Sequence, residues 1–429
     1  MNAVQLVFIR RQHDKPIATI LLIGLMTSTL MATFTESVDT TDDQGGHCTK
    51  DGVQGETCGG GVDSKSASKH ENKRWQKYLT KIENALKSYS PCRHNNCSCY
   101  DSVMDRDFAP FEAEGISKGM VELMKDKAVK YQVINHKLYR SEKCMFGPRC
   151  QGIEHFLHEI LDDLPDMEFY LNPRDFPHMP NYMKLAPVFS FSKVPSNERD
   201  ILYPAWSFWA GGPAISLFPT GIGRWDLLRK ELKRESERYP WDEKQDRAFF
   251  RGSRTSDQRD PLVLLSRAQP DLVDAQYTKN QAYKSPKDTL NAEPAKEVHF
   301  RDHCKYKYLF NFRGVAASFR FKHLFLCNSL VFHVGDDWIE FFYDALKPWV
   351  HYIPVSTSLN EVEELLQFVK ENDQVAREIA QRGFDFVWNH LRQEDVTCYW
   401  RTLLRRYAAL LRYKVKLDKT LVYRKPGDK

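Results

Sequence analysis

The stretch at residues 248–260 combines a glycine with hydroxyl and guanidinium side chains, the groups that proteins use to bind phosphate. Its apolar beginning, Ala-Phe-Phe, is typical of the end of a strand, and Gly252 then allows a sharp turn before a helix predicted at 260–265. Ser253 and two further hydroxyl residues can donate hydrogen bonds, and three arginines, the last of them Arg259, supply positive charge. The pattern predicts an anion site for a phosphate or a nucleotide.

A purely structural role for these arginines is the alternative, because arginines in a surface turn can pair with neighbouring carboxylates. No strict phosphate-loop pattern is present. On these residues alone, both interpretations stay open.

A second strand followed by a helix lies further along the chain. Residues 306–312 alternate as a strand does, Gly314 ends the strand, and a helix is predicted at 315–326. Ser318 and Arg320 fall in the first turns of that helix, where unpaired N–H groups favour anions. Two such sites in consecutive β/α units are less easily accidental than one.

A carboxylate, Asp175, follows the short apolar strand predicted at 167–171. It lies in the loop Asn172-Pro-Arg-Asp-Phe-Pro177, whose prolines restrict the backbone on both sides. Loops after strands are where α/β enzymes place catalytic groups, so Asp175 is a candidate catalytic residue. The alternative is that Asp175 caps a turn or pairs with Arg174.

Two segments, 204–213 and 218–225, alternate aromatic residues with glycines. Such loops let a sugar or a base ring approach the backbone closely, and Thr220 and Gly221 could present N–H groups to phosphate. The alternative is a plain connecting loop with packed tryptophans.

These candidate residues depend on strands and helices to position them. Further strands are predicted at 129–133, 136–139, 185–191, 272–276, 329–333 and 350–355, and further helices at 75–89, 152–161, 225–239, 360–371, 374–391 and 394–411. The two kinds of element alternate through the C-terminal half, which predicts a mostly parallel sheet covered by helices on both faces.

Length and composition fit two globular domains of ordinary size. The chain has 429 residues, of which 42% are hydrophobic and 13% aromatic, enough for a large core. A net charge of +5 is mild for a chain with 28% charged residues. We therefore expect no nucleic acid as a partner.

The N-terminus has the pattern of a secretory signal. Basic residues precede an uncharged apolar stretch at 17–34, so residues 1–35 are expected to be a signal peptide. A signal anchor that stays in the membrane is the alternative, because this stretch approaches the ~20 residues needed to span a bilayer. Residues 36–73 have few apolar positions and are expected to form a disordered leader.

The ten cysteines fit disulfides in an oxidising compartment. Metal binding is the rival interpretation, but no pair has the CxxC spacing and no histidine pair completes a zinc set. The sequon Asn96-Cys97-Ser98 is a glycosylation acceptor that fits the same compartment.

Six motifs, in order, resemble the protein O-glucosyltransferase 1 (Rumi) family of endoplasmic reticulum glycosyltransferases. They are Cys144-Met-Phe-Gly-Pro-Arg-Cys150, Asn172-Pro-Arg-Asp-Phe-Pro177, Trp206-Ser-Phe-Trp-Ala-Gly-Gly-Pro213, Pro219-Thr-Gly-Ile-Gly-Arg-Trp225, Phe249-Phe-Arg-Gly-Ser-Arg-Thr-Ser256 and Val315-Ala-Ala-Ser-Phe-Arg320. The likeness runs from about Trp75 to about Tyr413.

The resemblance implies a GT-B fold of two Rossmann-like α/β domains with an interdomain cleft. Its boundaries are expected at 74–236 for an acceptor-binding domain, at 237–392 for a nucleotide-sugar-binding domain, and at 393–429 for a C-terminal helix and tail that return to the first domain. The implied activity is inverting, metal-independent transfer of glucose from UDP-glucose to the serine of Cys-x-Ser-x-(Pro/Ala)-Cys in folded EGF-like repeats, such as those of Notch. Xylose is the alternative sugar, since a pocket discriminates one hydroxymethyl group weakly. We expect a monomer in the lumen of the endoplasmic reticulum with no tightly bound cofactor.

The family motifs also assign roles to residues of this chain. Asp175 corresponds to the catalytic base, which takes the proton of the serine hydroxyl. The implied UDP-sugar contacts are Thr220, Gly221, Ser253, Arg259, Val315, Ala316, Ala317, Ser318, Phe319 and Arg320. The implied acceptor contacts are Met145, Phe146, Gly147, Pro148, Arg149, Ala214, Ile215, Ser216, Leu217 and Phe218. The implied disulfides are Cys92–Cys99, Cys97–Cys398, Cys144–Cys150 and Cys304–Cys327.

The chain departs from the family pattern in two places. It ends in Arg424-Lys-Pro-Gly-Asp-Lys429 rather than in a KDEL-like retrieval signal, so retention by that signal is not expected. Cys48 and Cys58 have no family counterpart, and pairing with each other is one option.

Two rival functions remain open on the sequence. One is a metal-dependent GT-A transferase that uses Asp105-Arg106-Asp107 as its metal motif, a triplet that is otherwise ordinary surface charge. The other is a catalytically silent lumenal binder of EGF-like repeats.

Overall fold

The computed structural model describes residues 64–93, 96–209, 224–279 and 283–427. The predicted signal peptide, most of the predicted leader, Cys48, Cys58, Thr220, Gly221 and residues 214–218 lie outside these ranges. The described residues belong to one compact unit that begins at Asp63. None of the described helices combines the length and the apolar character that crossing a membrane requires.

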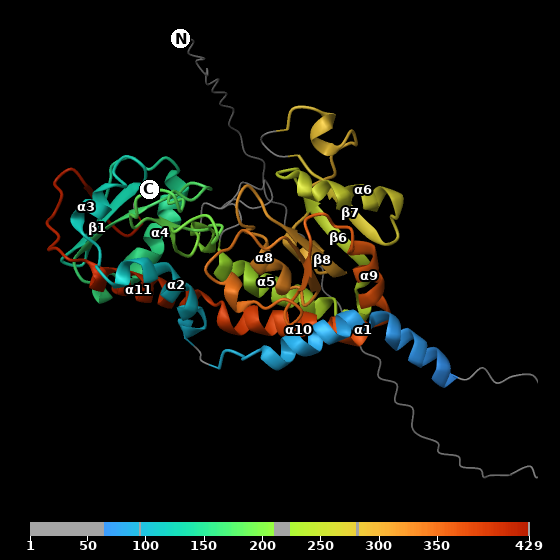
Figure 1. Ribbon diagram of the computed structural model, residues 1–429. Coiled ribbons are helices and arrows are strands. Elements are labelled where there is room, and N and C mark those ends of the chain that lie inside the picture. Colours follow the sequence, from blue (N-terminus) through green and yellow to red (C-terminus); the bar gives the residue numbers. More distant parts are fainter. Residues whose placement is uncertain (1–63, 94–95, 210–223, 280–282, 428–429) are drawn as a thin grey trace, which may run out of the picture. The chain divides into compact units, whose positions relative to one another are not determined.

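The elements alternate along the chain (Figure 1). The helices are α1 (Ser64–Ser88), α2 (Asp101–Glu112), α3 (Lys118–Glu122), α4 (Gly147–Ile160), α5 (Trp225–Arg238), α6 (Asp260–Ala268), α7 (Phe300–His303), α8 (Phe321–Phe325), α9 (Val362–Glu371), α10 (Asp373–His390) and α11 (Gln393–Leu410). The strands are β1 (Val129–Ile134), β2 (Lys137–Arg140), β3 (Met167–Leu171), β4 (Phe189–Ser190), β5 (Ile201–Leu202), β6 (Gln245–Gly252), β7 (Val273–Tyr277), β8 (Tyr306–Phe312), β9 (Leu330–Val334), β10 (Ile353–Val355) and β11 (Val422–Arg424).

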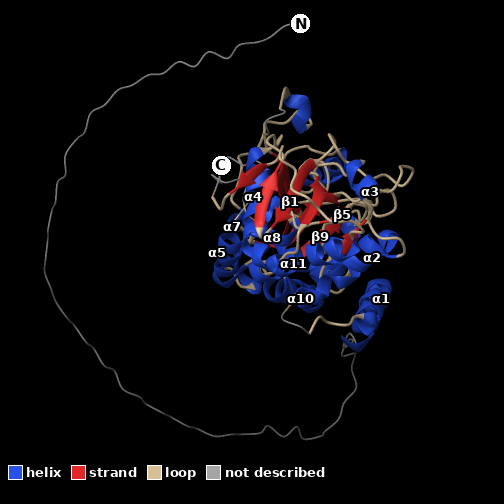
Figure 2. Ribbon diagram, turned by 90° about the vertical axis from the view of Figure 1, so that its left-hand side faces the viewer, coloured by secondary structure: helices blue, strands red, loops and turns tan. Residues whose placement is uncertain are grey.

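The C-terminal half is built on a five-stranded sheet in the order β10-β9-β8-β6-β7. Every pairing in it is parallel, with Phe310 opposite Phe332 in the β8–β9 ladder. All five residues of β9 are buried, as expected where helices cover both faces of a parallel sheet. The predicted parallel sheet is confirmed, and Figure 2 shows the helices that surround the strands.

The N-terminal half contains a mixed six-stranded sheet in the order β11-β2-β1-β3-β4-β5. β1 runs antiparallel to β2 and β3, whereas β3, β4 and β5 are parallel. Asn135 and His136 join β1 to β2 with φ angles of 49° and 58°. A two-residue hairpin with positive φ at both positions matches the twist of its strands.

The end of the chain returns to the N-terminal half. α11 packs against α4 and α2, and β11 adds to the sheet beside β2 (Figure 1). The hydroxyl groups of Tyr399 and Tyr407 donate to the carbonyl oxygens of Leu202 and Glu168, at 3.1 and 3.0 Å. These bonds fix α11 on the strands of this sheet.

Four disulfides are present among the described residues: Cys92–Cys99, Cys97–Cys398, Cys144–Cys150 and Cys304–Cys327. They are the four pairings that the family resemblance implies. Cys97–Cys398 joins positions 301 residues apart and ties α11 to the segment before α2.

α1 begins at Ser64, before the boundary expected at residue 74 for the N-terminal domain. Its residues Trp75 and Tyr78 pack on Phe368 of α9, with ring centroids 5.7 and 5.0 Å apart. The Trp75 Nε1 and Tyr78 Oη groups donate to Glu371 and Glu364. The helix therefore belongs to the core of the C-terminal half, because α9 offers it both an apolar face and acceptors.

The helix predicted at 315–326 begins only at Phe321, as α8. Residues 313–320 form a loop instead, in which the Ser318 N–H donates to Tyr343 Oη at 3.2 Å. The predicted strand at 185–191 is reduced to β4, since Pro187 cannot donate to a ladder. The predicted strand at 350–355 is likewise reduced to β10, because the N–H groups of Val350 and His351 donate to Lys347 in a turn.

Candidate functional site

The carboxyl ends of the parallel strands border a small cavity. Its lining includes Gln258, Arg313, Ser318, Gly335 and Thr357. These residues follow β6, β8, β9 and β10, and this edge of a parallel sheet is where α/β proteins bind ligands. Gly335 has a φ of +73°, which suits glycine at this turn.

Arg259 and Arg320 place two positive charges beside this cavity. Arg259 is buried and donates from Nη1 and Nη2 to the carbonyl oxygens of Ser253 and Arg313, each at 2.5 Å. Arg320 donates to the carbonyl oxygen of Arg251. Both guanidinium groups lie over the ring of Phe250, 5.5 and 5.1 Å from its centroid.

The two guanidinium groups lack a balancing charge. Burial lowers the pKa of Arg259 to about 9, with repulsion from Arg320 adding to the effect, and burial lowers the pKa of Arg320 to about 10. Within the described part of the chain, neither forms an ion pair with a carboxylate. A bound anion would relieve both the desolvation and the repulsion, so the pair favours an anionic ligand.

Arg251 and Arg254, in contrast, pair with carboxylates. Arg251 Nη2 lies 2.7 Å from Asp274 Oδ1, and Arg254 binds both carboxylate oxygens of Asp260. A purely structural role therefore fits Arg251 and Arg254 but not Arg259.

Ser318 is held at the centre of the 313–320 loop. Its hydroxyl donates to Asn311 Oδ1 at 2.7 Å, and Asn311 Nδ2 in turn lies 2.8 Å from His333 Nδ1. Burial lowers the pKa of His333 to about 3, so its ring is neutral at physiological pH. Val315, at the start of the loop, is 44% exposed.

The loop that carries Asp175 is tied to the sheet by Asn172. Asn172 Nδ2 donates to Phe176 O at 2.8 Å and to Ser190 Oγ at 2.9 Å, and its Oδ1 accepts from the Arg174 N–H at 2.9 Å. Side-chain bonds of this kind fix a turn locally. Asp175 therefore stands on a restrained loop after β3, as its sequence context predicted.

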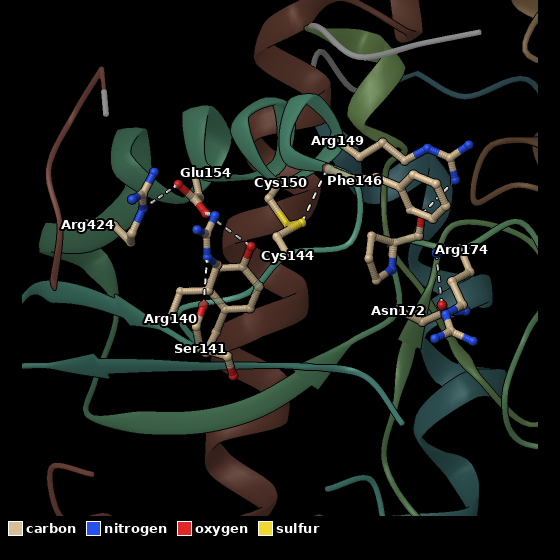
Figure 3. The surroundings of a disulfide bond; sticks show 12 residues. Arg140, Ser141, Cys144, Phe146, Arg149, Cys150, Glu154, Asn172, Arg174 and Arg424 are labelled. Atoms are coloured by element: carbon tan, nitrogen blue, oxygen red, sulfur yellow. Dashed lines mark hydrogen bonds and ion pairs between the residues drawn. A yellow bond between two sulfur atoms is a disulfide. The ribbon is translucent and has the colours of Figure 1, made fainter. Parts of the chain in front are cut away.

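Asp175 pairs with Arg149, not with Arg174 as the alternative interpretation expected. Arg149 Nη1 lies 3.2 Å from Asp175 Oδ1 and donates to Pro173 O at 2.7 Å. Arg149 lies within the Cys144–Cys150 loop, in the first turn of α4 (Figure 3). In that loop Met145 is 63% exposed.

Aromatic contacts connect the Asp175 side to the anion side. The Phe319 ring stacks on Phe191 at 5.1 Å between centroids and lies 5.7 Å from Trp206. The ring centroids of Phe176, which is next to Asp175, and Trp338 are 6.2 Å apart, and Trp338 lines the cavity. The structure therefore brings Asp175, Arg149 and the 313–320 loop into one region.

The two carboxylates of the rival metal motif, Asp105-Arg106-Asp107, bind basic side chains of the protein itself. Asp107 is buried, where it binds Lys193 Nζ at 2.6 Å and accepts from the Leu202 N–H at 2.8 Å. Asp105 lies 2.7 Å from Arg406. The two carboxylates thus serve different partners, and Asp107 is part of the core rather than surface charge.

Sequence reasoning missed several residues that line the cavity, among them Gln258, Gly335 and Trp338. The signal that could have identified Gly335 is its position directly after a predicted strand adjacent to β8. Trp338 carried no such signal, because only the folded chain brings it to Phe176.

Comparison with known proteins identifies close relatives. Residues 92–426 match the family model of glycosyl transferase family 90. An O-glucosyltransferase rumi homolog of Aedes aegypti is 60% identical over 350 residues, which are 81% of this chain and 87% of the relative. Protein O-glucosyltransferase 1 of Homo sapiens is 57% identical over 350 residues, 81% of this chain and 89% of the relative. O-glucosyltransferase rumi of Drosophila melanogaster is 56% identical over 356 residues, 81% of this chain and 86% of the relative.

Among solved structures, Anabaena Alr3699/HepE in complex with UDP-glucose has a TM-score of 0.29 and 11% identity. The likeness covers 42% of this chain and 52% of that one, and at this level it carries no argument about the site.

Proposed function

The chain belongs to glycosyl transferase family 90, in its protein O-glucosyltransferase 1 (Rumi) branch, and we propose that it transfers glucose from UDP-glucose to serine in folded EGF-like repeats. The acceptor serine is that of Cys-x-Ser-x-(Pro/Ala)-Cys. The observation that carries this proposal is the pair of cationic side chains, Arg259 and Arg320, which have no carboxylate partner among the described residues.

The proposal assigns the two halves to the two substrates. The N-terminal half, with Asp175 and the Cys144–Cys150 loop, takes the acceptor, and the parallel sheet of the C-terminal half takes the nucleotide sugar. This division corresponds to a GT-B arrangement with its boundary between residues 236 and 237 and a returning segment at 393–429, except that α1 joins the C-terminal half. The aromatic contacts of Phe319 and Trp338 across the two halves support it.

The reaction is a single displacement with inversion. The serine hydroxyl oxygen attacks the anomeric carbon from the face opposite UDP, and the bond between that carbon and the β-phosphate oxygen breaks. Asp175 accepts the hydroxyl proton, because a serine hydroxyl is a poor nucleophile at neutral pH. The electron pair of the broken bond leaves with UDP.

The departing β-phosphate gains negative charge, which Arg259 and Arg320 stabilise. A preorganised donor of this kind typically contributes about 3–4 kcal/mol to lowering a barrier. Because both guanidinium groups are already desolvated and already held by backbone carbonyl oxygens, little reorganisation is needed when the charge develops. We propose that these donors take the place of a metal ion.

We further propose the lumen of the endoplasmic reticulum as the site of action. The four disulfides support an oxidising compartment.

The test is a transfer assay with purified protein, UDP-glucose and a folded EGF-like repeat, run with and without chelator. A reduced and alkylated repeat is the matched control, and UDP-xylose replaces UDP-glucose in a parallel arm. We expect glucose on the folded repeat only, at the same rate with chelator. Absence of transfer from either sugar contradicts the enzymatic proposal and leaves a silent binder, whereas loss of transfer with chelator contradicts metal independence.

A further inference from the structure

Arg149 binds one oxygen of the Asp175 carboxylate and leaves the other open. Its Nη1 lies 3.2 Å from Oδ1, while no donor or cation in the described ranges of the chain contacts Asp175 Oδ2. The Asp175 side chain is 35% exposed. A carboxylate that is fixed through one oxygen can present the second one in a defined direction.

The Arg149 side chain is itself held on several sides. Its guanidinium group lies between the rings of Phe146 and Trp206, 4.3 Å from each centroid. The same Nη1 that meets Asp175 donates to Pro173 O at 2.7 Å, so one guanidinium contacts the loop on both sides of Arg174. Stacking of this kind is specific to a planar guanidinium, and lysine does not reproduce it.

The backbone under Arg149 is also fixed. The N–H groups of Arg149 and Cys150 both donate to Phe146 O, at 2.9 and 3.2 Å, and Cys150 is fully buried in its disulfide with Cys144 (Figure 3). One turn further along α4, Glu154 binds Arg140 and Arg424. The start of α4 is therefore a rigid support from which Arg149 reaches the Asp175 loop.

We propose that Arg149 is a positioning residue: it holds Asp175 through Oδ1 so that Oδ2 faces the acceptor hydroxyl. This inference rests on the proposed function, in which Asp175 is the base. It differs from a role as a simple acceptor contact, because Arg149 then acts through Asp175 and affects turnover rather than binding.

Other charged or titratable groups lie near this carboxylate. Arg174 and His178 belong to its own loop, and Tyr203 interacts electrostatically with Asp175 and Arg149. Asp337 precedes Trp338, whose ring contacts Phe176. Arg174 provides the matched control, since it is an exposed arginine adjacent to Asp175 that forms no ion pair with it within the described residues.

The experiment compares Arg149→Met, Arg149→Lys and Arg174→Met with the wild-type protein. Steady-state transfer from UDP-glucose is measured while the folded EGF-like repeat is varied, and UDP-induced thermal stabilisation reports folding. We expect Arg149→Met to lower kcat by about 100-fold, the cost of a misplaced catalytic group, with the acceptor KM unchanged. Arg149→Lys should regain part of kcat, and Arg174→Met should behave as wild type.

Two results overturn the inference: an Arg149→Met variant with wild-type kcat and a raised acceptor KM, or one with both constants unchanged. If Arg149→Met shows no stabilisation by UDP, Arg149→Lys decides, and wild-type kcat in that variant contradicts the inference. Failure of the wild-type protein to transfer glucose is a separate outcome, which contradicts the proposed function and this inference with it.

Discussion

At the scale of single residues, the site separates arginines by what they bind. Arg251 and Arg254 have carboxylate partners. Among the described residues, Arg259 and Arg320 instead contact backbone carbonyl groups and the ring of Phe250, and Arg320 also contacts the ring of Phe300. The sequence shows these arginines in two motifs, but it cannot show which carboxylate or carbonyl group each of them binds. Asp274, for example, reaches Arg251 only because β6 and β7 are neighbours in the sheet.

The same scale carries a prediction about the base. Asp175→Asn removes the group that accepts the serine proton while it keeps the shape of the side chain, so we expect turnover to fall by at least about 100-fold. UDP should still raise the melting temperature of the variant, because its contacts lie on the other half of the site. The measurement is glucose transfer beside a thermal shift with UDP, with the exposed Asp162→Asn as control. Near-normal turnover would show that another group is the base.

At the scale of elements, the turn after β6 depends on close approach. A Cβ atom on Gly252 would lie 2.9 Å from Arg320 Nη2 and 3.1 Å from Phe250 Cζ. We therefore expect Gly252→Ala to displace the Arg320 guanidinium and to weaken UDP binding by about 10-fold, the worth of one hydrogen bond to a charged group. Calorimetric titration with UDP measures this.

Gly119→Ala is the matched control for that variant, since a Cβ atom there has only Ser117 Oγ within reach, at 3.9 Å. An unchanged affinity for UDP in Gly252→Ala, with Gly119→Ala also unchanged, would mean that Arg320 moves without cost and does not hold the nucleotide.

The elements also show what local patterns can and cannot predict. β3 and β8 lie at the predicted residues because their apolar runs are bounded by a proline-containing loop and a glycine. The helix predicted at 315–326 shares its apolar pattern with α8, but a hydrogen bond from the Ser318 N–H to Tyr343, outside the segment, holds its first residues as a loop. β11 and α2 were not predicted, since a short edge strand and a helix with an internal proline carry weak periodicity.

At the scale of the whole molecule, a segment near each end of the described chain packs on the half that is more distant from it in the sequence. The last helix completes the N-terminal half through Cys97–Cys398, and α1 completes the C-terminal half through Trp75 and Tyr78. The parallel sheet of the C-terminal half followed from the alternation of elements alone. The pairing of Asp175 with Arg149 did not, because nothing in either local pattern points to the other.

Stability against acid is also a property of the whole molecule. Burial lowers the pKa of His303, His333 and His351 to about 3, from an ordinary value of 6.5. Each ring stays neutral in the folded protein and takes up a proton in the unfolded chain below pH 6.5, so acidification favours unfolding by about 1.4 kcal/mol per histidine for each pH unit. Burial also lowers the pKa of His323, which acts in the same direction, and it raises the pKa of Glu340 to about 7, which acts in the opposite direction.

We therefore expect the urea midpoint to fall steadily as the pH is lowered from about 6.5 to about 5. The contribution of one ring can be isolated at His351, which accepts from the Lys347 N–H at 2.8 Å and lies 3.2 Å from Tyr89 Oη, outside the proposed site. His351→Gln does not titrate, so its stability should depend less steeply on pH than that of the wild type, whatever its absolute stability. Exposed His136→Gln is the control and should keep the wild-type slope. A midpoint that rises on acidification, or equal slopes for the wild type and His351→Gln, would contradict this account, because a buried neutral ring that gains a proton only on unfolding must make stability fall with pH.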